Sequence, residues 1–157
     1  MTNRITKRIV TVSVLTIVVI LASIAYSHCQ VPCGIYNDDA RFNAITEHLT
    51  TIEKSMKLIE ELSGHEPVNT NQIVRWVNNK EKHADEISEI VTYYFMAQRV
   101  KLPPAGDTKA YNEYVKKLTL LHEMLVYAMK TKQTTDLANV EKLRDAAGKF
   151  HQAYTEK

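Results

Sequence analysis

Four stretches of the chain carry apolar residues at every third or fourth position. They cover about 42–62, about 71–100, a segment that starts near 107–108, and one that starts near 134–136. This spacing places the apolar side chains on one face of an α-helix, whereas no stretch shows the sustained alternation of a strand. The apolar stripes are Phe42, Ile45, Leu49, Ile52, Met56, Ile59 and Leu62; Ile73, Val77, Ala84, Ile87, Val91 and Tyr94; Tyr111, Tyr114, Leu118, Leu121, Leu125 and Ala128; and Leu137, Val140, Leu143, Ala147, Phe150 and Tyr154.

Capping and turn residues separate these stretches. The run 37–39 (Asn-Asp-Asp) offers caps and negative charge to the first helix, and Gly64 can end it. Pro67 precedes the second stretch, and the pair 103–104 (Pro-Pro) forbids helix after it. Four helices joined by short loops predict an all-α fold, an antiparallel up-down four-helix bundle over about 38–155 with an irregular N-terminal arm.

The N-terminal segment has the three parts of a secretory signal peptide. Residues 2–8 are basic, residues 9–25 are almost wholly apolar, and Ala25 and Ser27 are small residues that suit a cut before His28. The alternative is an uncleaved membrane anchor, because the apolar stretch is close to the shortest length that spans a bilayer.

Cleavage defines the expected domain organisation. Residues 1–27 form the leader, and 28–157 form one domain, exported to a periplasmic, luminal or secreted location. A signal-type peptidase is then a partner, and only the leader contacts a membrane. The leader carries three basic residues and no acidic one, so the remainder has a formal net charge of −1. This balance gives no electrostatic case for binding nucleic acid.

Both cysteines of the chain lie directly after the predicted cut. A free amine at His28, the amide nitrogen of Cys29 and the Cys29 thiolate form two fused five-membered chelate rings around a metal, and Cys33 can return a second thiolate. Planar nitrogen and sulfur donors favour Ni(II) or Cu(II) over tetrahedral zinc. Spacing alone is also compatible with a Cys29–Cys33 disulfide or a thiol pair for redox exchange.

The wider motif narrows this choice. The run 28–36, His-Cys-x-x-Pro-Cys-Gly-x-Tyr, resembles the metal-binding hook of nickel-containing superoxide dismutases, and the run 40–42 (Ala-Arg-Phe) is also similar to that family. The resemblance implies one nickel ion per chain, which cycles between Ni(II) and Ni(III) and converts superoxide to O₂ and hydrogen peroxide. It implies as ligands the His28 amine and imidazole, the Cys29 amide nitrogen, and the thiolates of Cys29 and Cys33.

The resemblance also implies further roles. Tyr36 would line the approach of superoxide, Pro32 would hold the loop turn, and the chain would assemble as a homohexamer of four-helix bundles. Some members carry a glutamate that orients the hook histidine, and the matching position here is Asn43. Asparagine can accept the same hydrogen bond, but it lacks the charge.

The remaining chemistry-bearing residues have simpler interpretations. No histidine beyond the hook has a glutamate three residues earlier, as a di-iron bundle site would need. We therefore expect all five on the surface or in an interface, and we expect the run 80–82 (Lys-Glu-Lys) to be a solvated face. The aromatic run 93–95 is expected to pack in the core or between subunits. The five histidines are His48, His65, His83, His122 and His151.

Two other functions remain open at this point. One is an exported nickel or copper binding and delivery protein that has the hook but does not turn over superoxide. The other is a membrane-anchored helical interaction module in which Cys29 and Cys33 pair. The enzyme needs a free His28 amine, about one nickel ion per chain and fast loss of superoxide, whereas the anchored module keeps residues 1–27.

Overall fold

The structure is a computed structural model that describes residues 6, 10–14 and 38–156. The predicted cut and the hook, residues 28–36, lie outside the described residues. In the N-terminal part, residues 6 and 10–14 are helical, and their three valines are more than half exposed. Among the described residues, no helix has the length and apolar character needed to cross a membrane.

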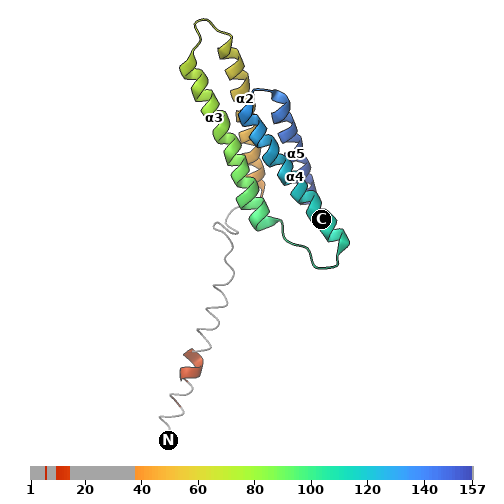
Figure 1. Cartoon of the computed structure of the whole chain (residues 1–157). Coiled ribbons are helices and arrows are strands. Elements are labelled where there is room, and N and C mark those ends of the chain that lie inside the picture. Colours follow the sequence, from red (N-terminus) through yellow and green to blue (C-terminus); the bar gives the residue numbers. More distant parts are fainter. Residues whose placement is uncertain (1–5, 7–9, 15–37, 157) are drawn as a thin grey trace. The chain divides into compact units, whose positions relative to one another are not determined.

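Residues 38–155 fold into four long helices, as predicted. These are α2 (Asp38–Ser63), α3 (Thr70–Glu89) with its continuation η1 (Ile90–Arg99), α4 (Thr108–Gln133) and α5 (Leu137–Thr155). The helices α2 and α3 form one antiparallel hairpin, and α4 and α5 form another (Figure 1). The two hairpins pack together through contacts of α3 with α4 and of α2 with α5. The predicted antiparallel four-helix bundle is confirmed.

Side-chain caps begin three of the helices near the predicted positions. The Asn69 side chain accepts a hydrogen bond from the Gln72 amide at the start of α3. Asp107 accepts one from the Ala110 amide at the start of α4, and Asp136 caps α5 in the same way. Each cap satisfies a backbone donor that the first helical turn leaves without a partner.

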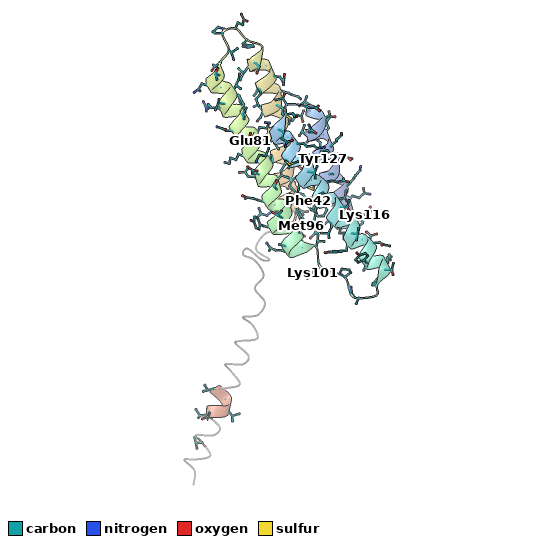
Figure 2. All side chains as sticks on the ribbon, viewed as in Figure 1. Phe42, Glu81, Met96, Lys101, Lys116 and Tyr127 are labelled. Carbon is teal, nitrogen blue, oxygen red and sulfur yellow. The ribbon has the colours of Figure 1, made fainter. Side chains whose placement is uncertain are left out.

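The core consists largely of the predicted stripes. Ring centroids of Phe42 and Phe95 lie 4.9 Å apart, and Phe150 lies 4.9 Å from Phe95, so an aromatic cluster joins α2, η1 and α5. Figure 2 shows Phe42 and Met96 at the same end of the bundle. The buried apolar residues of the cluster are Phe42, Ile45, Leu49, Ile52, Met56, Ala84, Ile87, Val91, Tyr94, Phe95, Leu120, Leu121, Met124, Ala128, Val140, Leu143, Ala146, Ala147, Phe150 and Ala153.

The first turns of α4 depart from the prediction. Tyr111, expected on the inner stripe, is 56% exposed, and Tyr114 is half-buried. Both line a hollow of about 330 Å³ together with the loop 102–107, so this part of α4 packs beside a proline-containing loop. The apolar spacing of a helix does not reveal whether a neighbouring helix extends far enough to cover it.

Lys80 also departs from the prediction, because it is only 3% exposed. Its Nζ donates to the carbonyl oxygens of Thr131 and Lys132, both at 2.7 Å, and of Thr134 at 3.2 Å. These carbonyls lie at the C-terminal end of α4, where the helix leaves acceptors without partners and carries partial negative charge. Lys80 is therefore a buried cap that ties α3 to α4, not part of a solvated face.

Ten residues near the end of the second predicted helix, Ile90–Arg99, form a π-helix, η1. Its closing bond runs from the Val100 amide to the Phe95 carbonyl at 2.9 Å, a five-residue step. Tyr94 and Phe95 are buried as predicted, whereas Tyr93 is 58% exposed. Apolar periodicity predicted a helix here but not its wider turn.

Candidate functional site

The four predicted site residues, His28, Cys29, Cys33 and Tyr36, lie outside the described residues. The described chain resumes at Asp38, two positions after Tyr36. The described residues that follow the hook most closely in the sequence are those of the first turn of α2.

Asp38 is the centre of a hydrogen-bonded cluster. Arg99 binds the carboxylate in a bidentate manner: its Nε donates to Oδ1 at 2.8 Å and its Nη2 donates to Oδ2 at 2.7 Å. The Tyr94 hydroxyl donates to Oδ1 at 2.6 Å, and the Tyr154 hydroxyl donates to Oδ2 at 2.8 Å. We call Asp38, Tyr94, Arg99 and Tyr154 the Asp38 clamp. Four charge-assisted bonds, two of them from a planar guanidinium, fix both the position and the rotation of the carboxylate.

The π-helix explains how η1 supplies two members of the clamp. Tyr94 and Arg99 are five residues apart, and in an α-helix they would point about 140° from one another. The wider turn of a π-helix, with hydrogen bonds between residues five apart, instead brings such positions closer to the same face. The Arg99 guanidinium lies 5.5 Å from the centre of the Tyr94 ring, and both side chains reach Asp38.

The clamp keeps Asp38 ionised and its tyrosines protonated. Burial tends to raise the pKa of Asp38, but the hydrogen bonds from Arg99, Tyr94 and Tyr154 outweigh it and lower the pKa below its usual value. Burial, followed by the bond to Asp38, raises the pKa of Tyr94 to about 12 and also raises that of Tyr154. Both phenols therefore remain hydrogen-bond donors across the physiological range.

The next turn of α2 connects the clamp to the core. The Arg41 guanidinium lies 5.3 Å from the centre of the Tyr94 ring, within the range of a cation–π contact. Phe42 is buried and stacks on the exposed His151 with ring centroids 4.0 Å apart. Asn43, which the resemblance matches to an orienting glutamate, is exposed.

Comparison with known families decides to which protein family the chain belongs. A family model described as nickel-containing superoxide dismutase matches residues 23–157. The chain belongs to this family. The match covers the hook as well as all four helices, although no curated protein and no solved structure gave a match of its own.

Membership of the nickel superoxide dismutase family carries the activity, the substrate superoxide and a nickel cofactor. The thiols of Cys29 and Cys33 and the imidazole of His28, near the start of the matched region, are side-chain donors that fit nickel. The sequence-based predictions of the family, the enzyme class and the cofactor are thus confirmed, and the residues that hold the metal remain a prediction.

Histidines outside the hook only partly follow the prediction. His65, His122 and His151 are exposed. The side chains of His48 and His83 are only 15% and 20% exposed, and their Nδ1 atoms lie 2.8 Å apart. They pack against one another because they occupy facing positions on the hairpin of α2 and α3.

Sequence reasoning identified Asp38 only as a helix-capping acid and did not find its partners. Tyr94 and Tyr154 were assigned to the apolar stripes, and Arg99 was not singled out. The one local signal was an acid at the start of a predicted helix. Its partners come from positions 56, 61 and 116 residues away, which local spacing cannot reveal.

Proposed function

We propose that a peptidase cuts this chain between Ser27 and His28, and that the exported product dismutes superoxide with one nickel ion bound by the new N-terminus. The ligands are the amine and imidazole of His28, the amide nitrogen of Cys29, and the thiolates of Cys29 and Cys33. Nickel supplies the one-electron redox change, and Tyr36 lines the path by which superoxide approaches.

The main support for this proposal is that the region matched by the family model includes the hook. The match begins at residue 23 and therefore includes every proposed ligand. The motif 28–36 contains both cysteines of the chain, so no other thiolate pair is available to the metal.

The Asp38 clamp, which follows the hook in the sequence, supports the same assignment of the metal ligands. A short metal-binding loop keeps its geometry only when the elements next to it are rigid, because ordering a loose segment costs conformational entropy on binding. Asp38 is fixed by four hydrogen bonds to α5 and η1. The chain that leaves Tyr36 is thus anchored within two residues.

Export and assembly belong to the proposal as well. The basic, apolar and small-residue parts of 1–27 support secretion by a signal-type peptidase into a periplasmic, luminal or external space. Homohexamer formation follows the family resemblance. It is supported by apolar side chains exposed on the described surface, including Leu102 at 81% and Tyr111 at 56%.

The decisive experiment is intact-mass and metal analysis of protein purified from its native host, combined with an assay of superoxide loss. We expect a chain that begins at His28, with free thiols after nickel removal and about one nickel ion per chain. Cys29→Ser and Cys33→Ser should each abolish activity while far-UV circular dichroism stays helical, because neither cysteine belongs to an apolar stripe.

A matched control tests the amine separately. A chain with one extra residue ahead of His28 should lose nickel binding, because the terminal amine becomes a weakly donating amide. An active enzyme that retains residues 1–27 would refute the proposal. A metal-loaded, correctly processed chain without turnover would instead identify a nickel carrier.

A further inference from the structure

The hairpin of α2 and α3 carries a second group of metal-ligating side chains, apart from the hook. His48 extends from α2, and His83 and Glu86 lie one turn apart on α3. The Nδ1 atoms of the two histidines are 2.8 Å apart, and they lie 3.3 and 3.2 Å from the same Glu86 oxygen, Oε2. We call these three residues the His48 triad.

The contacts within the His48 triad are hard to satisfy by hydrogen bonds alone. Only one hydrogen fits between two facing Nδ1 atoms 2.8 Å apart, so one imidazole donates and the other accepts. If His83 donates to His48, or the reverse, that hydrogen and the acceptor's lone pair are used between the two rings, so neither Nδ1 has a hydrogen left for the Glu86 oxygen 3.2–3.3 Å away. A cation in place of this hydrogen would be bound by both nitrogens and the oxygen.

The spacing also suits a small divalent ion. Zinc–nitrogen and zinc–oxygen bonds of about 2.0–2.2 Å in a tetrahedron place neighbouring donors about 3.3–3.5 Å apart. The two distances to Glu86 nearly meet this value, and the two histidine nitrogens would separate by about half an ångström. The donor set of two imidazoles and one carboxylate leaves a fourth position for water.

The surroundings of His48 favour its neutral, ligand form. Burial is the main influence on the pKa of His48 and lowers it; His83 and Lys82 act in the same direction, while Glu86 and Glu47 oppose it. The imidazole therefore keeps a free lone pair at neutral pH. The other Glu86 oxygen, Oε1, lies 3.7 Å from the Lys82 ammonium, which helps to orient the carboxylate.

We propose that His48, His83 and Glu86 bind a divalent transition-metal ion of the zinc type and that this ion links α2 to α3. The site goes beyond superoxide dismutation, since its nitrogen and oxygen donors differ from the thiolates of the hook. An ion here closes a loop of the hairpin between positions 35 residues apart, so it should stabilise the fold.

The test uses the nickel-loaded enzyme, in which the hook is occupied, and adds Zn²⁺ in equilibrium dialysis with both metals quantified. We expect one zinc ion per chain without loss of nickel, and a higher unfolding temperature with zinc present. His48→Gln, His83→Gln and Glu86→Gln should each weaken zinc binding at least tenfold, a lower bound set by the roughly 10–100-fold cost of removing mere supporting groups. His122→Gln, an exposed histidine on α4, is the matched control.

Cobalt provides an independent readout. Co²⁺ bound to nitrogen and oxygen ligands should show visible d–d absorption without the thiolate charge-transfer band that hook binding would add. Circular dichroism checks that each variant folds, and the half-exposed Glu86 gives the variant that disturbs packing least. No zinc uptake by the wild-type enzyme, or uptake that all three triad variants retain, would overturn the proposal. Either result would leave the assay of superoxide loss unaffected, so the two proposals fail separately.

Discussion

At the scale of single residues, Asp38 connects the hook to the bundle. Its carboxylate accepts two hydrogen bonds from Arg99 and one from each of two tyrosine hydroxyls. Its side chain is only 25% exposed. Its negative charge also lies at the positive end of the α2 dipole. The lowered pKa of Asp38 means that the folded state stabilises the ionised form, so the clamp contributes stability only while that form persists.

Asp38→Asn should lower the free energy of unfolding by about 2 kcal/mol at neutral pH, because hydrogen bonds to a charged group are worth about 1.5–3 kcal/mol. The difference from the wild type should persist above the ordinary aspartate pKa of 3.8 and vanish as the pH falls through the lower pKa of the folded state. Urea unfolding followed by circular dichroism at several pH values measures it.

Asp39→Asn is the matched control, because it removes the same charge from the next, exposed position of the same helix turn. It should change stability by no more than about 0.5 kcal/mol. Equal losses in both variants would show that the helix dipole, rather than the clamp, accounts for the effect.

At the scale of elements, a lysine joins the two hairpins. Lys80 on α3 donates to three carbonyls at the end of α4, and burial lowers its pKa. The positive end of this side chain satisfies acceptors that would otherwise be left within the protein without a partner. The junction of α3 and α4 thus depends on one buried charge in addition to apolar packing.

Lys80→Met should destabilise the bundle by about 2–3 kcal/mol, because the methionine keeps the apolar stem but leaves buried carbonyls unsatisfied. Lys82→Met, two residues along the same helix and 72% exposed at its side chain, should cost less than about 1 kcal/mol. Thermal or urea unfolding of both variants tests this. If Lys80→Met is as stable as Lys82→Met, the cap has no energetic role.

Helical periodicity and capping residues predicted the four helices, since both are local properties of the sequence. They did not predict the π-helix, because its apolar residues also fit an α-helical stripe. They misplaced Lys80 and Tyr111, since the burial of a residue depends on which element lies opposite. The hook could be recognised from nine consecutive residues, whereas the Asp38 clamp and the His48 triad depend on pairings between distant helices.

At the scale of the whole molecule, the exposed apolar residues favour one position for a contact of the proposed homohexamer. Leu102, Tyr111 and Val115 are 81%, 56% and 41% exposed, and the first two line the same hollow. An apolar surface of this kind suits a subunit interface better than bulk water. We therefore place one contact of the proposed homohexamer at the loop 102–107 and the first turns of α4.

Leu102→Asp should shift the assembly from six chains to smaller species, because the introduced carboxylate would lose its hydration in the interface. Sedimentation velocity measures the change, and circular dichroism should remain helical since Leu102 is outside the core cluster. Lys54→Ser, at an exposed site on α2 outside this proposed contact, should leave the assembly intact. A wild-type protein that sediments as a monomer would contradict the proposed homohexamer itself.

The Asp38 clamp also sets an order of events during synthesis. Tyr94, Arg99 and Tyr154 reach Asp38 from 56, 61 and 116 residues further along the chain. A nascent polypeptide that has emerged only as far as α3 therefore lacks every side chain that fixes Asp38 at the start of α2. Productive capture of nickel should wait until α5 has been translated and has docked, which places metallation after folding and not before it.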